Sequence, residues 1–379
     1  MDEADVAYCL LEDAALWFQG VDIPVSSVVL SVQWDNFKET WSLFTWYTPT
    51  EINSHPEYDD YTFQLDGMQV EVRCYYNTVV ATDPHRMEIA REGQAFWVKS
   101  IDYYLHAVNE GHPYFQAIKR YLHDLQVTNN EVAKLAWTKG TYDAWLQRFG
   151  EPEEVAKSIK KDPLAKITSI SKWTGELEGQ RVINLLGSHG TKAIAMAKLG
   201  ASATVVDISE ENARYAQEVA EAAGVELRYI VSDVLSLNDE ELVGSYDLVF
   251  MELGILHYFV DLTPLFEIVS KLLKPGGRMI LQDFHPISTK LITSKGKKHK
   301  VAGNYFSKNL IPTQVAFTKY LTEEKEISYV YERKWTLGEI ITAVAQVGLF
   351  IKELDEQPNI KLSDRGIPKL FTIVAEKKE

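Results

Sequence analysis

Hydrophobic and polar positions alternate in a regular way through the second half of the chain. Short apolar runs, each followed by a longer helical pattern, lie between residues 181 and 284. These runs read RVINLL, ATVVDIS, LRYIVSD, YDLVFMELG and RMILQDF. Strands separated by helices of about 10–15 residues predict a parallel sheet with right-handed crossovers. One more helix, WTLGEIITAVAQVG, and a final strand, KLFTIVAEK, follow. We therefore expect a doubly wound α/β fold here.

The first part of the chain has a different pattern. Residues 7–20 look helical and stop at Gly20, and residues 97–125 look helical again. Between them lie the strand-like runs SSVVLSVQW, YTFQLDG and MQVEVRCYY. An Asp-Gly pair, Asp66-Gly67, joins the last two and predicts a hairpin. The segment is therefore expected to be a smaller α+β domain.

These patterns divide the chain of 379 residues into two predicted domains. The smaller covers residues 1–118 and the larger 119–379, with a helix-rich, aromatic cap at about 126–175. The run SKGKKHK, residues 294–300, is expected to be a loop.

Charge and cysteine content narrow the class of protein. The formal net charge is -15, and an acidic surface of that size repels the phosphate backbone, so nucleic acid is not expected as a substrate. Two cysteines are too few for a disulfide framework or an iron–sulfur cluster, and no metal site is expected. The acidic start of the chain does not resemble a signal peptide, and no apolar run approaches the ~20 residues of a membrane span. We expect a cytoplasmic protein.

Polar residues follow the predicted parallel strands at the points where a doubly wound sheet binds its ligand. The turn after the first strand contains Gly187 and Gly190, and Asp207, Asp233 and Glu252 end the next three strands. A glycine turn lets the backbone approach a ligand closely. Asp207 can accept hydrogen bonds from both hydroxyls of a ribose and would repel a 2′-phosphate, which disfavours an NADP-type cofactor.

The third acid decides between the remaining cofactors. Asp233 can accept a hydrogen bond from an adenine amino group, which S-adenosylmethionine sites usually require and NAD-type sites do not. The turn also has two glycines where the dinucleotide fingerprint has three. Without a pyrophosphate to hold, fewer glycines are needed, and S-adenosylmethionine is favoured.

At these positions the chain resembles the class I S-adenosylmethionine-dependent methyltransferases that act on small molecules. The resemblance covers residues ~126–379 and rests on VINLLGSHG, TVVDIS, VSDVLSL, YDLVFMELGILHYFVD, LLKPGGRMIL and WTLGEIITAVAQVGL. It implies a Rossmann-like, doubly wound, mostly parallel seven-stranded sheet with an antiparallel last strand. It also implies methyl transfer from S-adenosylmethionine, with S-adenosylhomocysteine as the product.

The first motif departs from the family pattern V-L-D-L-G-x-G-x-G. Leu186 and Ser188 replace two of its glycines, and Asn184 replaces the acid. Gly187 is shifted by one position and is expected to restore the turn. The asparagine carbonyl can still accept from the amino group of the cofactor, and we expect the site to be retained.

The resemblance assigns the cofactor to a defined set of residues. The expected contacts are Asn184, Gly187, Ser188, Gly190, Asp207, Ile208, Asp233, Val234 and Glu252, with Trp137 and Tyr142 from the cap. Aromatic rings near a sulfonium can offer a cation–π contact, but such rings at helical spacing are also typical of a core. Trp137, Tyr142 and Trp145 are open to both interpretations.

The methyl acceptor is expected beyond the fourth and fifth strands. His257 and His285 follow those strands, and either can act as a base because histidine titrates near neutrality. Tyr258 stands beside His257, and a packing role for His257 is the structural alternative. The segment lacks the N-P-P-Y and Pro-Cys motifs of nucleic-acid methylases, which favours a small-molecule acceptor. Tyr305 and the lysines of SKGKKHK could cover this site.

Residues 7–76 resemble, more faintly, a small nucleotidyltransferase-fold domain. In that fold a D-x-D pair and a third carboxylate bind the metal that activates a nucleotide. Ser27 and Val29 stand at the D-x-D positions here, and Glu71 stands near the third. One carboxylate cannot hold two divalent ions, so this domain is expected to be degenerate and to bind a substrate or support oligomerisation.

Three whole-protein hypotheses follow. The first is a cytoplasmic small-molecule methyltransferase that does not act on nucleic acid or membranes, with a homodimer left open. The second is a non-catalytic protein that senses S-adenosylmethionine or S-adenosylhomocysteine. The third is a nucleotidyltransferase with an appended methyltransferase-like domain, which Ser27 and Val29 disfavour.

Overall fold

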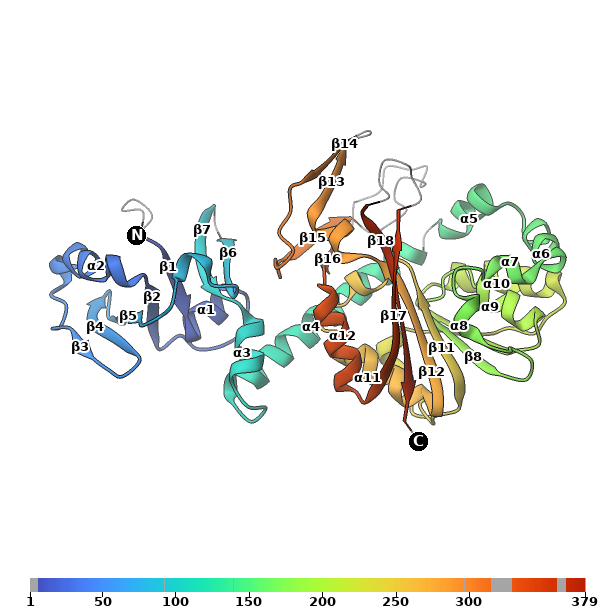
Figure 1. Cartoon of the computed structure of the whole chain (residues 1–379), viewed down its shortest axis with the longest axis horizontal. Coiled ribbons are helices and arrows are strands. Elements are labelled where there is room, and N and C mark those ends of the chain that lie inside the picture. Colours follow the sequence, from blue (N-terminus) through green and yellow to red (C-terminus); the bar gives the residue numbers. More distant parts are fainter. Residues whose placement is uncertain are drawn as a thin grey trace. The chain divides into compact units, whose positions relative to one another are not determined.

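The computed structural model describes residues 6–91, 93–138, 140–295, 298–314, 329–359 and 366–378. The chain divides into two compact units (Figure 1). Unit 1 comprises Met1–Leu125 with Phe306–Asn309, and unit 2 comprises Gln126–Tyr305 with Leu310–Glu379. Helix α4 (Pro113–Thr138) contributes residues to both. Within the described ranges, no helix is both long enough and apolar enough to cross a bilayer.

Unit 1 is built on a mixed seven-stranded sheet with the order β3-β4-β5-β2-β1-β7-β6. Its strands are β1 (Tyr8–Leu11), β2 (Ser27–Val32), β3 (Asn53–Ser54), β4 (Tyr58–Leu65), β5 (Met68–Tyr75), β6 (Arg86–Arg91) and β7 (Gln94–Lys99). Its helices are α1 (Glu12–Phe18), α2 (Phe37–Leu43) and α3 (Ile101–Ala107), followed by the first half of α4. Strand β2 pairs with β5 in parallel and with β1 in antiparallel orientation. The expected smaller α+β unit is therefore present.

Two predictions for unit 1 have opposite outcomes. The hairpin at Asp66-Gly67 is confirmed: β4 and β5 pair on either side of it, and both turn residues have positive φ. The helix expected over 7–20 is wrong in its first half, because Tyr8–Leu11 forms a strand that pairs with β2. Tertiary pairing decides the structure of a short apolar run whose local pattern fits a helix equally well.

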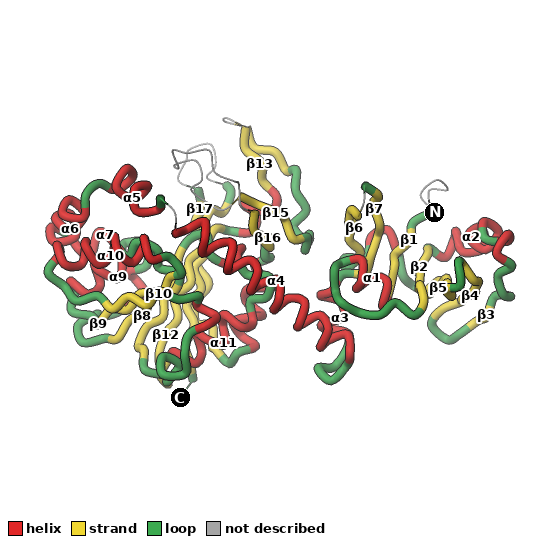
Figure 2. Tube along the Cα trace, turned by 180° about the vertical axis from the view of Figure 1, so that it is seen from behind, coloured by secondary structure: helices red, strands yellow, loops and turns green. Residues whose placement is uncertain are grey.

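Unit 2 contains the predicted doubly wound sheet, in the order β10-β9-β8-β11-β12-β18-β17 (Figures 1 and 2). The strands are β8 (Arg181–Leu185), β9 (Ser202–Asp207), β10 (Arg228–Val231), β11 (Tyr246–Glu252), β12 (Leu273–Phe284), β17 (Leu349–Pro358) and β18 (Pro368–Lys377). The first five in chain order are parallel to one another, and β18 is antiparallel to both β12 and β17. Numbered along the chain within this sheet, the order is 3-2-1-4-5-7-6.

Helices cover both faces of this sheet. They are α5 (Thr141–Phe149), α6 (Pro152–Lys161), α7 (Pro163–Lys166), α8 (Ser171–Thr174), α9 (Thr191–Lys198), α10 (Glu210–Ala223), α11 (Thr263–Leu272) and α12 (Leu337–Gln346). Successive residues of β11 point to opposite faces: Leu248 and Phe250 pack with α9 and α10, whereas Val249 and Met251 pack with α11 and α12. A strand buried on both faces reads as a continuous apolar run, which is why YDLVFM predicted it well.

Two features of unit 2 differ from the sequence predictions. The tail holds a further strand, β17, between α12 and β18, where the pattern predicted only a helix and one strand. Its sequence LFIKELDEQP is half exposed and lies at the sheet edge, so its apolar signal is weak. The expected loop SKGKKHK forms much of a hairpin of β13 (Ile292–Lys295) and β14 (Lys298–Val301), while residues 296–297 lie outside the described part.

Candidate active site

The turn after β8 keeps the backbone of a three-glycine motif, although two of its three glycines are replaced. Leu186, Ser188 and Gly190 have φ values of 49°, 48° and 65°, in the left-handed region that glycine adopts at little cost. Gly187 does not have positive φ, so it does not supply a left-handed backbone to the turn. Its role is close packing instead, since a Cβ there would lie 2.6 Å from Asn184 Oδ1 and 2.7 Å from Val205 Cγ1.

Asn184 is buried at the end of β8 and ties this strand to its neighbour. Its Nδ2 donates to the carbonyl of Phe250 at 3.2 Å, and its Oδ1 is the atom that Gly187 passes closely. The side chain of Asn184 therefore packs against Gly187 of the turn and links β8 to β11. The proposed contact of its carbonyl oxygen with a cofactor remains a prediction.

The carboxylate of Asp207 joins the turn after β8 to the end of β9. Its Oδ2 accepts from the backbone N–H of Ser188 at 2.9 Å. Its Oδ1 accepts from the N–H of Ser209 at 3.1 Å and from Asn212 Nδ2 at 2.9 Å. Burial raises the pKa of Asp207, and these hydrogen bonds act in the opposite direction. Ile208 follows directly, partly exposed at the same strand end.

Asp233, at the end of β10, accepts from two donors. Its Oδ1 accepts from the N–H of Leu235 at 3.0 Å, which starts a short 3-10 turn at the buried Val234. Its Oδ2 accepts from the side-chain amide of Asn130, on α4, at 2.7 Å. An amide –NH2 and an adenine amino group are donors of the same kind. Asn130 therefore donates to the carboxylate oxygen of Asp233 that is predicted to accept from the adenine of the ligand.

The sequence predictions missed a row of amides on α4. Gln126 Nε2 donates to Asn130 Oδ1 and to the carbonyl of Tyr258, and Gln126 Oε1 accepts from the N–H of Val260. Asn129 bonds both the N–H and the C=O of Tyr331. The spacing 126, 129 and 130 places the three amides on one helix face, a signal that the sequence contained. This face fixes the segments after β10 and β11.

The cap is attached to the start of α10. Glu211 accepts from the N–H groups of Gly140 and Tyr142, and Ser209 Oγ donates to the carbonyl of Trp137 at 2.7 Å. The ring of Tyr142 lies under the Arg214 guanidinium, 4.1 Å from its centroid, and its hydroxyl bonds Glu218. Trp137 and Tyr142 also pack against the hydrophobic cluster of α9 and α10. The ring and the hydroxyl of Tyr142 therefore both contact side chains of α10.

Glu252, the acid that ends β11, forms an ion pair with Lys192 in the first turn of α9. Ser169 Oγ lies 3.4 Å from the same carboxylate and accepts from Lys192 Nζ at 2.7 Å. Glu252 therefore connects the end of β11 to the start of α9, which follows the turn after β8.

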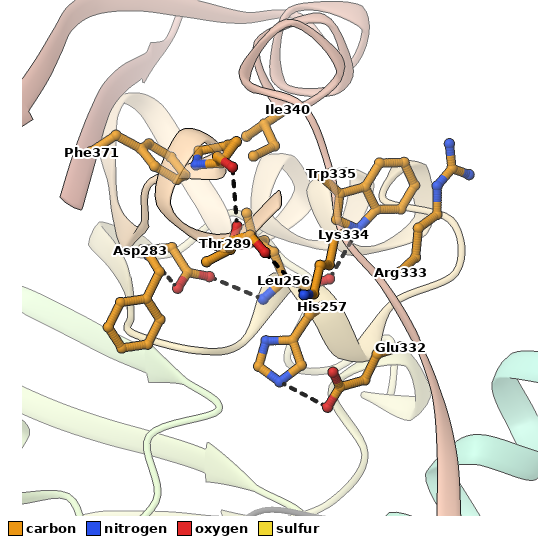
Figure 3. Close-up of a pocket in the computed structure, with 12 residues that line it drawn as sticks. Leu256, His257, Asp283, Thr289, Glu332, Arg333, Lys334, Trp335, Ile340 and Phe371 are labelled. Carbon is orange, nitrogen blue, oxygen red and sulfur yellow. Dashed lines mark hydrogen bonds and ion pairs between the residues drawn. The ribbon is translucent and has the colours of Figure 1, made fainter. Parts of the chain in front are cut away.

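A pocket of about 280 Å³ opens beyond β11 and β12 (Figure 3). Its apolar wall is formed by Leu256, Phe284, Trp335, Ile340 and Phe371. The carboxyl ends of parallel strands meet at one edge of a sheet, so this pocket and the ends of β8, β9 and β10 share an edge.

The three candidate catalytic residues differ in their relation to the pocket. His257 lines it, and its Nε2 lies 3.5 Å from Glu332 Oε1 (Figure 3). The ring of Tyr258 lies tilted against that of His257, with centroids 4.3 Å apart, and Tyr258 is not among the lining residues. His285 is 1% exposed; its Nδ1 accepts from the N–H of Ile287, so its Nε2 donates to Glu356 at 2.7 Å. Of the three, His257 is available to a ligand in this pocket.

Asp283, which no sequence pattern indicated, fixes the turn that carries His257. Its carboxylate is buried and accepts from the N–H groups of Gly254, Ile255 and Leu256. Leu253 and Gly254 both have positive φ, which directs three successive N–H groups toward one acid.

Comparisons with known proteins agree with this geometry over part of the chain. The family model of a methyltransferase domain matches residues 182–277. A ubiquinone biosynthesis O-methyltransferase of Bordetella avium is 28% identical over 136 residues, which is 36% of this chain and 56% of that protein. The enzyme of the same name from Xanthomonas euvesicatoria is 34% identical over 106 residues, 28% of this chain and 44% of that protein. The chain thus spans about half the length of these relatives.

One solved structure with a related arrangement is an S-adenosylmethionine-dependent methyltransferase, described as putative, from Listeria monocytogenes. It is 18% identical, with a TM-score of 0.46, and the alignment covers 56% of this chain and 98% of that one. The segment that matches the methyltransferase-domain model, residues 182–277, lies within the doubly wound sheet of unit 2.

Proposed function

We propose that the protein transfers a methyl group from S-adenosylmethionine to a hydroxyl oxygen of a small molecule. The observation that carries the proposal is the shared sheet edge, where a tight turn, Asp207, Asp233 and the pocket of His257 follow successive strands. The match of residues 182–277 to a methyltransferase domain supports it. The relatives' names describe O-methyl transfer, which supports oxygen as the acceptor atom.

The donor chemistry of the site suits this cofactor. Asp207 would accept from the ribose hydroxyls and Asp233 from the adenine amino group, replacing the amide of Asn130 that now donates to it. Asn184, Gly187, Ser188 and Gly190 would form the turn beside the cofactor. Ile208, Val234 and Glu252 would flank it, with Trp137 and Tyr142 in the cap above.

The cofactor would supply an electrophilic methyl carbon on a sulfonium. The residues of the chain have to hold the acceptor oxygen in line with that carbon and remove its proton. His257 is placed to take the proton, because it is the pocket's imidazole. The apolar wall of the pocket favours an acceptor with a flat, hydrophobic body.

Calorimetry with S-adenosylmethionine and S-adenosylhomocysteine tests the proposal. We expect binding by the 379-residue chain, and Asp207→Ala should weaken it about 10–100-fold, because a hydrogen bond to a charged group contributes about 1.5–3 kcal/mol. Asp247→Ala is the matched control, since this acid pairs with Lys274 at the opposite end of β11. Equal dissociation constants for the wild type and Asp207→Ala would contradict the assignment. Turnover on a panel of hydroxylated metabolites then separates catalysis from sensing.

Unit 1 is proposed to be a degenerate nucleotidyltransferase-like domain. Val29 and Glu71 lie side by side on the paired strands β2 and β5, which supports the assignment of Glu71 to the third carboxylate position on a later strand. Glu71 Oε1 bonds Arg73 Nε at 2.5 Å, and Arg73 NH1 bonds Glu12 at 2.6 Å. An arginine already neutralises the one acid that remains at these positions, which supports loss of metal binding.

We propose a small-molecule acceptor, no nucleic-acid or membrane partner, a cytoplasmic location, and a homodimer as the assembly to test first. The formal net charge of -15 supports the exclusion of nucleic acid.

A further inference from the structure

The pocket holds a carboxylate directed at the proposed base. Glu332 lies on β16 (Tyr329–Arg333), far from His257 in sequence, and its side chain is only 13% exposed. A carboxylate so little exposed needs a partner, because desolvation disfavours its charged form. Its Oε1 lies 3.5 Å from His257 Nε2. The distance suits an ion pair with a protonated ring.

The position of Glu332 is set by the surrounding structure. Strand β16 pairs with β15 (Leu310–Gln314) on one side. Asn129 bonds the N–H and C=O of the neighbouring Tyr331, at 3.0 Å and 2.8 Å. On the other side, Asp283 holds the turn that precedes His257. The backbone beside each member of the pair is therefore held by its own set of hydrogen bonds.

The other charged groups of the pocket have partners elsewhere. Asp283 accepts from backbone N–H groups, Arg333 pairs with Glu339, and Lys334 Nζ donates to the carbonyl of Thr289. Figure 3 shows the second ring nitrogen of His257 turned away from Glu332. That nitrogen, Nδ1, can therefore accept a hydrogen bond from a ligand in the pocket.

We infer that Glu332 is a positioning residue that makes His257 the base for a neutral hydroxyl acceptor, such as a phenol. Nε2 keeps its hydrogen toward Glu332, and Nδ1 receives the proton of the hydroxyl. The O–H electron pair stays on the acceptor oxygen, and the imidazolium that forms is paired with Glu332. The pocket, about 280 Å³, exceeds the roughly 150 Å³ that holds benzene, so a phenol ring fits. This inference rests on the proposed function.

The test uses 4-nitrophenol, whose absorption distinguishes phenol from phenolate, with the whole 379-residue chain and no cofactor. We expect the wild type to bind the probe with a raised ratio of phenolate to phenol at neutral pH. Glu332→Gln should lower that ratio about tenfold, and His257→Gln should lower it equally. Glu332→Asp, which keeps the charge, should restore most of it.

The second histidine–carboxylate pair provides a matched control. Glu356→Gln removes the carboxylate from His285, which does not line the pocket, and should leave the ratio unchanged. A wild type that does not bind 4-nitrophenol, or an unchanged ratio in Glu332→Gln, would overturn the inference. Because the cofactor is not needed, failure of S-adenosylmethionine binding would overturn the proposed function without affecting this result.

Discussion

At the scale of single residues, the turn after β8 separates two properties that glycine combines. One is a left-handed backbone, which Leu186 and Ser188 adopt at the positions of the missing glycines. The other is the absence of a Cβ, which Gly187 exploits against Asn184 and Val205. A left-handed residue with a side chain costs roughly 1–2 kcal/mol, so this turn stores strain next to the proposed cofactor.

Substitution at these two positions should have opposite effects on stability. Ser188→Gly relieves the left-handed strain, offset in part by the entropy of an unfolded glycine, and should raise the free energy of unfolding by about 0.5–1 kcal/mol. Gly187→Ala places a Cβ at non-bonded distances below 3 Å and should lower it by about 1–3 kcal/mol. Urea denaturation, followed with a probe in unit 2, measures the change in the free energy of unfolding for both variants. Destabilisation by Ser188→Gly would contradict the role given to strain.

At the scale of elements, α4 and the cap organise the site. The amides of Gln126, Asn129 and Asn130 hold Tyr258, Tyr331 and Asp233, which belong to three different segments. Helix α5 reaches the turn after β8 through His189, whose ring contacts Trp145 and Phe149 with centroids 5.1 Å and 4.7 Å apart. Helices α4 and α5 are thus part of the framework of the site.

His189 should make the attachment of the cap sensitive to acid. Burial lowers the pKa of His189 to about 4, whereas the ring titrates near 6.5 when unfolded. The folded state binds the proton less well than the unfolded state does. The contribution of His189 to the free energy of unfolding is therefore complete above pH 6.5, and about 2–3 kcal/mol of it is lost as the pH falls toward 4. NMR titration of the ring should give a midpoint near 4. His189→Phe should reduce the loss of stability over this range, and an unchanged pH dependence would argue against this origin.

At the scale of the whole molecule, the two units differ in the charged side chains that their sheets present to a ligand. Unit 2 has carboxylates at three strand ends and a pocket on the same edge of its sheet. Unit 1 keeps a sheet in which Val29 and Glu71 are neighbours, but Glu71 is neutralised by Arg73. Across the described ranges, no cluster of three or more metal-ligating side chains occurs.

Nucleotide binding distinguishes the whole-protein hypotheses. We expect calorimetry with ATP and magnesium to show no magnesium-dependent binding, because Ser27 and Val29 supply no carboxylate and Glu71 is paired. S-adenosylmethionine should bind equally well with and without ATP. Magnesium-dependent ATP binding that Glu71→Ala abolishes would instead support the nucleotidyltransferase hypothesis.

The sequence by itself determined the parts of this protein that are continuous in the chain. The β-α alternation from residue 181, the hairpin at Asp66-Gly67 and the acids at strand ends follow from periodicity and spacing, because strands buried on both faces give strong apolar runs. Weaker signals failed: Tyr8–Leu11 looked helical, and the half-exposed β17 was missed.

Only the tertiary structure decided which residues meet. His257 and His285 looked equivalent in sequence, yet one lines the pocket and the other is bonded to Glu356 outside it. Glu332, Asp283 and Asn130 act on segments distant along the chain, and local patterns carry no information about such pairs. Their positions depend on strand register and on buried hydrogen bonds, which exist only once the sheet has formed.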